Sequence, residues 1–367
     1  MSFIMNNLSA LRVHIVGGGI AGLAVGYHIA NQVERITIYD TSIGPGLSGA
    51  SVASAGLLHP ITTSGKLMWR GNEAYSSARN LLNVVQSQNV SSKLFQDSRL
   101  YHTFYSTSDY EKWQAAAKEL PEYIECCDID QLDSTLSSIN HIVEKPIVGS
   151  VRIKNACIVN SPLYLKCLYQ SITRRNENTN WVQYNVNDSN DYQKLRQSPD
   201  DIVVITAGAG VKHLWPHEDI ENLQYAKGQN LIYSSDDMKI SNGYICGEYI
   251  VPSVNNEFIF GASYEYSSDS LEKGPDSSDA LKYLDRSPFY KNYLYDKDIA
   301  RVTSGIRVVP RRGHKGKLPM MLKHKKIPNV YCITGLGSRG LLYHSLLADL
   351  MVKAIVSHDE SVLDTAK

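Results

Sequence analysis

The sequence lacks the features that mark a metal-binding, secreted or membrane-spanning protein. Its 367 residues include six cysteines, with no C-x-x-C pair and no zinc-like spacing to histidine, so we expect reduced thiols, a cytoplasmic location and no metal. Adjacent Cys126 and Cys127 are interpreted as idle thiols, with a vicinal disulfide as the alternative. The N-terminus has no basic region, and glycines interrupt the apolar stretch at residues 14–30, which argues against a signal peptide or a membrane span.

The sequence also lacks an excess of charge of either sign. It contains 37 basic and 37 acidic residues, so no global field attracts nucleic acid or an anionic membrane. With 43% apolar residues, a chain of this length is predicted to form two domains or one large discontinuous domain. A local basic band at residues 311–326 is interpreted as a solvated loop, and contact with an RNA backbone is the alternative.

The first motif that carries chemistry runs from residue 13 to residue 41. A short apolar strand leads into G-x-G-x-x-G, a helix, and a second strand that ends in Asp40. The glycines permit a tight turn and close approach to a pyrophosphate, the helix N-terminus favours negative charge, and an acid accepts hydrogen bonds from a ribose. The pattern predicts a dinucleotide site, with a plain glycine-rich turn as the alternative. Its candidate residues are Gly17, Gly19, Ile20, Ala21, Gly22, Asp40 and Thr41.

A second run of small residues, 44–60, is unsuited to an ordinary helix or strand. Its segments Gly49-Ala50-Ser51 and Ala55-Gly56-Leu57-Leu58-His59-Pro60 resemble segments of the D-amino acid oxidase superfamily of FAD-dependent enzymes. The resemblance implies that FAD is the cofactor and that this backbone lines the flavin ring. A surface loop is the alternative. The position of His59 stays open between facing the substrate and packing beside Pro60.

Later segments extend this resemblance. The strand at 181–186 places Val182 where the superfamily holds the adenine part of FAD, and the strand at 201–206 ends in a small turn with Ala207 and Gly208. Lys227-Gly228-Gln229 resembles the K/R-G-Q segment where the chain leaves for the substrate domain. A strand at 330–334 precedes a glycine-rich turn and an amphipathic helix predicted to run through about residue 356, whose N-terminus would stabilise a reduced flavin. The turn contributes Gly337, Ser338, Arg339, Gly340 and Leu341.

The segment at 304–310 resembles the G-x-R segment with which D-amino acid oxidases and glycine oxidases hold a substrate carboxylate. Arg307 is the predicted anchor, since a guanidinium makes two charge-assisted hydrogen bonds to a carboxylate. A structural salt bridge is the alternative. Tyr249 and Tyr264, expected on strands beside a hairpin tip at 253–256, are candidates to face the flavin or to fill structural positions. No cysteine lies near Arg307, so FAD is expected to be noncovalent.

The predicted fold class is α/β, with a Rossmann-like FAD-binding domain and a discontinuous substrate domain of mixed or antiparallel sheet. We expect the FAD-binding domain at residues 1–90, 155–222 and 327–367, and the substrate domain at 91–154 and 223–326. Helices are predicted at 71–89, at 109–119 and from 157 to 172.

The implied reaction is hydride transfer to flavin N5 from the carbon that bears a neutral amine, in a small amino acid or secondary amine. Oxygen or another acceptor would reoxidise the flavin. Residues 57–60 and 335–341 also resemble the oxidase domain of the bifunctional enzyme that trims carboxymethylaminomethyl-uridine in tRNA. The zero net charge and the missing methyltransferase domain favour a small substrate over tRNA. A flavin-binding protein without turnover is the third hypothesis.

Overall fold

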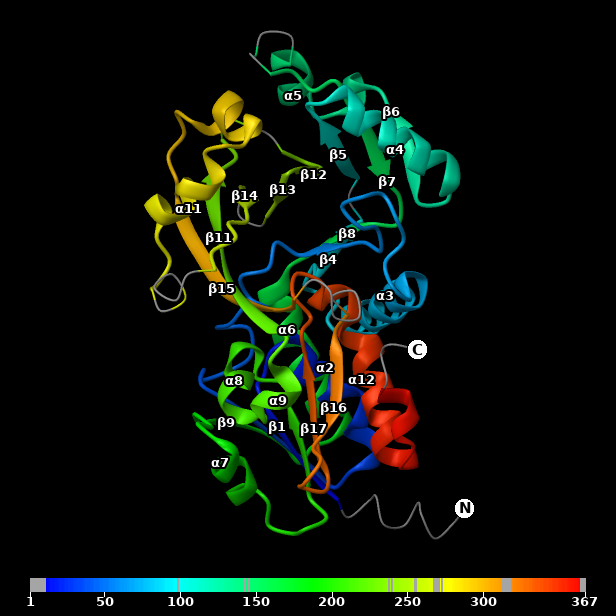
Figure 1. Ribbon diagram of the computed structural model, residues 1–367, viewed down its shortest axis with the longest axis vertical. Coiled ribbons are helices and arrows are strands. Elements are labelled where there is room, and N and C mark those ends of the chain that lie inside the picture. The colour runs from blue at the N-terminus through cyan, green and yellow to red at the C-terminus, as the bar shows by residue number, and fades with distance from the viewer. Residues whose placement is uncertain are drawn as a thin grey trace.

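Three sheets and the helices packed on them make up the computed structural model (Figure 1). Two predicted features lie partly outside the described residues: Val254 and Asn255 of the expected hairpin tip, and residues 312–317 of the basic band. The structure describes residues 11–97, 99–140, 143, 145–236, 238, 240–253, 256–266, 271, 273–311 and 318–363.

A six-stranded sheet in the lower half of Figure 1 has the order β16-β17-β10-β1-β2-β9. All its neighbouring strands are parallel except β16, which is antiparallel to β17. The predicted boundary between residues 326 and 327 falls between these two strands, so residues 320–323 pair with the FAD-binding sheet. The strands are β1 (Arg12–Val16), β2 (Arg35–Asp40), β9 (Thr179–Gln183), β10 (Ile202–Ile205), β16 (Met320–Lys323) and β17 (Val330–Thr334).

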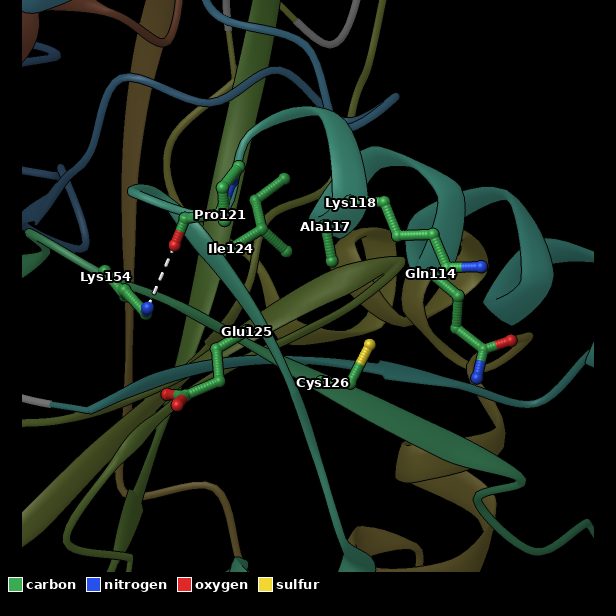
Figure 2. Close-up of a pocket in the computed structure, with 8 residues that line it drawn as sticks. All are labelled: Gln114, Ala117, Lys118, Pro121, Ile124, Glu125, Cys126 and Lys154. Atoms are coloured by element: carbon green, nitrogen blue, oxygen red, sulfur yellow. Dashed lines mark hydrogen bonds between the residues drawn. The ribbon is translucent and has the colours of Figure 1, made fainter.

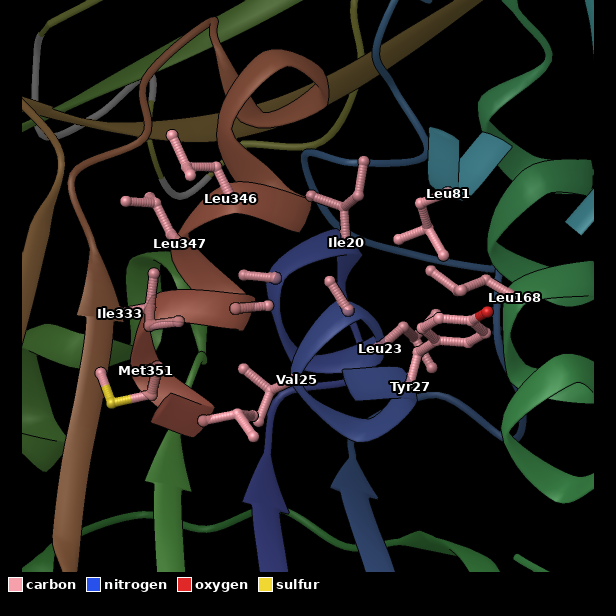
Figure 3. Close-up of a cluster of buried hydrophobic side chains, with 14 of the residues drawn as sticks. Ile20, Leu23, Val25, Tyr27, Leu81, Leu168, Ile333, Leu346, Leu347 and Met351 are labelled. Carbon is pink, nitrogen blue, oxygen red and sulfur yellow. The ribbon is translucent and has the colours of Figure 1, made fainter. Parts of the chain in front are cut away.

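Helices cover both faces of this sheet, as its buried apolar strands require. In Figure 3, Leu23 and Val25 lie between Leu347 and Met351 on one side and Leu168 on the other. These side chains belong to a layer formed by α2 (Ile20–Ile29), α3 (Gly71–Ser87), α6 (Ser161–Arg175) and α12 (Gly340–Ser357). The second buried cluster packs on β10 and includes residues of α7 (Ser189–Lys194), α8 (Val211–Leu214) and α9 (His217–Ile220).

Helix α12 is the central helix of the larger core. Within the described chain it is the one helix long and apolar enough to cross a membrane, but 72% of it is buried inside the protein. It packs against both α2 and α3. Its apolar composition is therefore explained by its place in the core.

The small residues of α2 bring this helix close to its neighbours. A Cβ on Gly22 would lie 2.0 Å from the Gly17 carbonyl oxygen, whereas a Cβ on Gly26 would lie 3.1 Å from Cδ1 of Ile172. Ala30, four residues after Gly26, lies just after α2 in the short helix η1 (Ala30–Gln32). Gly22 thus fixes the approach of α2 to the glycine turn, and Gly26 its approach to α6.

An eight-stranded sheet occupies the upper half of Figure 1, with the order β15-β11-β14-β13-β12-β5-β7-β6. Its neighbours are antiparallel except for the parallel pair β12 and β5. The strands are β5 (Leu100–Phe104), β6 (Ile124–Cys127), β7 (Gly149–Ile153), β11 (Leu223–Ser234), β12 (Gly243–Cys246), β13 (Glu248–Pro252), β14 (Glu257–Gly261) and β15 (Arg301–Pro310).

Helices and a small third sheet complete the structure. The third sheet has the order β3 (Leu57–Leu58), β8 (Cys157–Val159) and β4 (Phe95–Asp97). The remaining helices are η2 (Ile129–Gln131), η3 (Gly208–Gly210), η4 (Tyr290–Leu294), η6 (Glu360–Leu363), α4 (Thr107–Glu119), α5 (Ser134–Ile139) and α11 (Ser277–Leu284).

Three predicted elements differ from the structure at their ends. Residues 157–159 form strand β8, and α6 begins only after Asn160, whose side chain accepts a hydrogen bond from the backbone N–H of Leu163. Strand β9 ends at Gln183, and Tyr264 follows strand β14 instead of lying within a strand. The pairing of β8 with its neighbouring strands is a tertiary contact, whereas the Asn160 cap that begins α6 is a local one.

Replacing Gly22 by alanine is expected to lower the free energy of unfolding by about 2 kcal/mol or more, because the new methyl group meets a backbone carbonyl. The matched variant Gly26→Ala adds the same methyl group to the same helix but meets only the end of a side chain, so its loss should be smaller. Urea unfolding of both variants measures the difference. Equal stabilities would contradict the close contact at Gly22.

Candidate functional site

A cavity of about 950 Å³ lies between the carboxyl ends of the parallel strands and the eight-stranded sheet. Ligands of open α/β sheets bind at this edge, where the loops that follow the strands meet. Every predicted site residue lines the cavity except Gly22 and Val182. Gly22 lies beneath the glycine turn, and Val182 lies on the edge strand β9, where it pairs with Tyr39.

The glycine turn after β1 forms one end of the cavity. Gly17 has φ of +105°, and a Cβ there would lie 2.5 Å from the carbonyl oxygen of Thr206, so this position requires glycine. The Thr206 hydroxyl donates to the Gly17 carbonyl at 2.8 Å. Asp40 accepts hydrogen bonds from the Gly18 N–H at 2.8 Å and from the Ser42 N–H at 2.8 Å. The turn and the acid are therefore held together.

The loop at residues 44–60 joins this turn to the eight-stranded sheet. The hydroxyl of Ser51 accepts from the N–H of Ile20 in the first turn of α2 at 3.1 Å. A Cβ on Gly305 of β15 would lie 2.6 Å from Cα of Ala50. The loop thus runs between the N-terminus of α2 and strand β15, with Ala55, Gly56 and neighbouring residues facing the cavity.

A second helix N-terminus faces the cavity from the opposite side of the loop. The turn before α12 includes Gly335 and Gly337, both with positive φ, and the Gly337 N–H donates to the carbonyl of Val308 at 2.9 Å. Residues 337–341 line the cavity. A helix N-terminus carries free N–H groups and partial positive charge, which favour a negative group on a ligand.

Arg307 lies in the cavity without an acidic partner among the described residues. Its Cζ lies 4.2 Å from the ring centroid of Tyr264, and Nη1 donates to the Ser263 carbonyl at 3.4 Å. A Cβ on Gly228 would lie 2.1 Å from Nη2, so the guanidinium crosses over strand β11. Among the described residues, no salt bridge includes Arg307. This arrangement favours ligand binding over the alternative of a structural ion pair.

Tyr249 extends a chain of hydrogen bonds to the small-residue loop. Its hydroxyl donates to Oδ1 of Asn230 at 2.7 Å, and Nδ2 of Asn230 donates to the carbonyl of Ala53 at 2.6 Å. Burial raises the pKa of Tyr249 to about 12, while the nearby charge of Arg307 acts in the opposite direction. The phenol is therefore neutral at physiological pH. Tyr264 is 43% exposed and contributes its ring to Arg307.

Sequence reasoning missed a buried polar network behind Arg307. Glu265 is 1% exposed, and its Oε1 accepts from the Ser263 hydroxyl at 2.5 Å and from the side chain of Gln229 at 2.9 Å. The Ser263 hydroxyl also accepts from the backbone N–H of Gln229 at 2.9 Å. The network fixes the segment that carries Tyr264 and the carbonyl facing Arg307. Only Gln229, within the K-G-Q segment, gave a sequence signal.

The two histidines of the cavity are both neutral. Burial lowers the pKa of His59 to about 4 and that of His102 to about 4. Nδ1 of His59 accepts from the backbone N–H of Ile61 at 3.3 Å. His59 lines the cavity, and its contact with a substrate stays a prediction. His102 was missed because nothing in its short strand distinguishes it.

A separate pocket of about 420 Å³ lies between α4 and β6 (Figure 2). Two of its charged groups have protein partners: Lys154 donates to the Pro121 carbonyl at 2.9 Å, and Glu125 pairs with Arg152 at 2.7 Å. Cys126 is exposed there as a free thiol. Burial raises the pKa of its neighbour Cys127, which keeps that thiol protonated. None of the predicted site residues lies in this pocket.

The main cavity fits FAD. Gly17 leaves no space for a Cβ at the turn where a pyrophosphate would approach, and Asp40 lies where a ribose would follow. The loop at 49–57 and the N-terminus of α12 face each other across the space for a flavin ring. Residues 49–51, 55–57 and 337–341 would hold that ring.

Comparison with known proteins agrees with this geometry. The chain is 24% identical over 360 residues to the tRNA 5-methylaminomethyl-2-thiouridine biosynthesis bifunctional protein MnmC of Marinobacter nauticus, covering 93% of this chain and 55% of that protein. The chain thus spans about half the length of this curated relative.

Two solved structures share the fold. Glycine oxidase from Geobacillus kaustophilus has a TM-score of 0.74, with 19% identity and 97% of each chain covered. Iminodiacetate oxidase from Chelativorans sp. BNC1 has a TM-score of 0.72, with 16% identity, 94% of this chain and 95% of that chain covered. The sequence profile described as FAD dependent oxidoreductase matches residues 12–354. The chain therefore belongs to the family of FAD-dependent oxidoreductases related to D-amino acid oxidase, and FAD is its cofactor.

Proposed function

We propose that this protein oxidises the C–N bond of a small amino acid or secondary amine that carries a carboxylate. The observation that carries the proposal is Arg307, a cationic group in the cavity without an acidic partner among the described residues. Its planar guanidinium suits a carboxylate, which it binds with two parallel hydrogen bonds. Tyr264 and the Ser263 carbonyl hold it in place.

The protein's part in the reaction is to bind and orient the substrate. Arg307 binds the acid, and Tyr249, neutral and hydrogen-bonded to Asn230, forms the wall beside it. Bound FAD would supply the hydride-accepting chemistry at the carbon next to the nitrogen, held by residues 49–51, 55–57 and 337–341, and water would hydrolyse the imine product. Positioning supplies most of the rate in such a reaction. His59 lines the cavity as a neutral side chain beside the loop that contains Leu57.

A second candidate substrate is the carboxymethylaminomethyl group of a tRNA uridine. The 24% identity to a protein of tRNA 5-methylaminomethyl-2-thiouridine biosynthesis favours it, and the group contains both an acid and a secondary amine. The net charge of zero argues against a large polyanion, so we rank the small amine first. Both substrates would use the same site, with oxygen or another acceptor completing the cycle.

Anaerobic mixing tests the proposal directly. D-amino acids and N-alkyl glycines should bleach the flavin absorption of the holoenzyme, whereas total tRNA should not. Bleaching by tRNA alone would reverse the ranking, and the absence of bleaching by any amine would sink both substrates. Reoxidation of the reduced enzyme by air, with detection of peroxide, tests oxygen as the electron acceptor. A parallel assay with a dye tests another acceptor.

Arg307→Ala should raise the KM for a carboxylated amine roughly 10-fold to 100-fold, since hydrogen bonds to a charged group contribute about 1.5–3 kcal/mol. Steady-state kinetics with saturating acceptor measures the change. The matched control is Arg301→Ala on the same strand, because Arg301 is exposed and pairs with Glu257 at 2.7 Å. Its KM should equal that of the wild type. An unchanged KM in Arg307→Ala would remove Arg307 from the substrate site.

The pH dependence of kcat/KM should follow the substrate. His59, with a pKa of about 4, and Tyr249, with a pKa of about 12, keep their protonation states between about pH 6 and pH 10. The rate should rise with pH as the substrate amine becomes neutral, and the midpoint should move when an amine of lower pKa is used. A midpoint common to both amines would assign it to a cavity group, such as Glu248, whose pKa is raised by burial.

A further inference from the structure

The cavity continues beyond the residues that would hold a flavin and a substrate carboxylate. Its far part, here named the distal lobe, is lined by His59, Ile61, Met68, His102, Trp113 and Ile153. These residues come from the loop after β3, from β5 and β7 of the eight-stranded sheet, and from α4. The lobe is continuous with the space beside Leu57 and Tyr249, which line the same cavity.

The distance from the substrate anchor to the distal lobe follows from the order of the strands. The Arg307 side chain crosses β11 and lies near enough to Tyr249, on β13, for its charge to lower the pKa of that phenol. From β13 to β5, which carries His102, there are two strand steps. Neighbouring strands lie about 4.8 Å apart, so the lobe begins about 10 Å from the guanidinium. Glycine is too short to reach it.

The walls of the distal lobe are apolar and rigid. The His102 ring stacks on Phe104 at a centroid distance of 4.5 Å and an interplanar angle of 9°, and the ring centroid of Trp113 lies 4.5 Å from that of His102. Trp113 is 4% exposed, and Ile61 is fully buried. Such walls favour a flat apolar or aromatic group.

The polar groups of the distal lobe carry no charge. Nδ1 of His59 accepts a backbone N–H, so the proton of the neutral ring is on Nε2, which is a donor without a partner among the described residues. Burial lowers the pKa of both histidines to about 4. No Lys, Arg, Asp or Glu belongs to the six residues that define the lobe. A charged group would lose hydration there without gaining a partner.

We propose that the substrate carries an uncharged planar ring with a hydrogen-bond acceptor, and that this ring binds in the distal lobe while the acid binds Arg307. The inference rests on the proposed oxidation of a carboxylated amine. The ring is the part of the substrate that would distinguish this protein from an enzyme that acts on glycine itself. His102 and Trp113 become specificity-determining residues.

Three N-substituted glycines test the proposal in anaerobic reduction of the holoenzyme. Sarcosine has no ring, N-benzylglycine has a ring without an acceptor, and N-(pyridin-3-ylmethyl)glycine has both and is neutral in its ring at pH 8. We expect kcat/KM to rise in that order, at least tenfold from first to last. Equal values, or sarcosine as the best substrate, would overturn the proposal.

Thioether analogues separate this proposal from the proposed function, because they lack the amine and bind without turnover. (Pyridin-3-ylmethylthio)acetate should perturb the flavin spectrum at a concentration at least tenfold lower than (methylthio)acetate. If this difference is found but no amine is turned over, ring binding in the distal lobe is supported and the proposed oxidation is rejected. Equal dissociation constants for the two thioethers would reject ring binding in the distal lobe, whatever the amine kinetics show.

His59→Phe keeps an aromatic ring and removes the Nε2–H that would donate to the pyridyl nitrogen. It should reduce the preference for the pyridyl over the benzyl compound at least threefold, with the FAD content unchanged. His213→Phe, the same change at an exposed position on α8, should leave that preference as in the wild type. Loss of FAD from His59→Phe would place the cofactor in the lobe and overturn the proposal, as would an unchanged preference.

Discussion

The close approach of the glycine turn after β1 to the end of β10 is the contact on which the rest of the structure depends. Gly17 lies against the carbonyl of Thr206, whose hydroxyl holds the turn, and Gly22 lies directly beneath it. A side chain at either glycine would separate α2 from the sheet. Because the turn is fixed, the helix N-terminus and Asp40 face the same cavity, which is what a pyrophosphate and its ribose require.

The eight-stranded sheet completes the site because it lies close to the small-residue loop. Gly305 allows β15 to approach Ala50, and Asn230 connects the loop at Ala53 to Tyr249. The same two long strands, β11 and β15, carry Arg307 into the cavity. The position of Arg307 relative to the small-residue loop is therefore set by contacts between this loop and the eight-stranded sheet.

Burial controls the charge of the cavity. It keeps His59 and His102 neutral and the phenol of Tyr249 protonated, and Arg307 is the group in this cavity that we propose to bind an acid. Behind Arg307, Oε1 of Glu265 accepts hydrogen bonds from Ser263 and Gln229, while its buried Oε2 has no hydrogen-bond partner among the described residues. A buried network of this kind holds a cationic side chain in one position without neutralising it.

The sequence by itself determined the cofactor and most of its binding segments. The spacing of Gly17, Gly19 and Asp40 and the small-residue loops depend on local backbone requirements, which a linear pattern records. Local pattern did not reveal that Val182 lies outside the cavity, that His102 lines it or that Glu265 supports Arg307. Those facts depend on which strands become neighbours across a long sequence separation. Only the tertiary structure decides that pairing, because it is set by packing between sheets and not by any single segment.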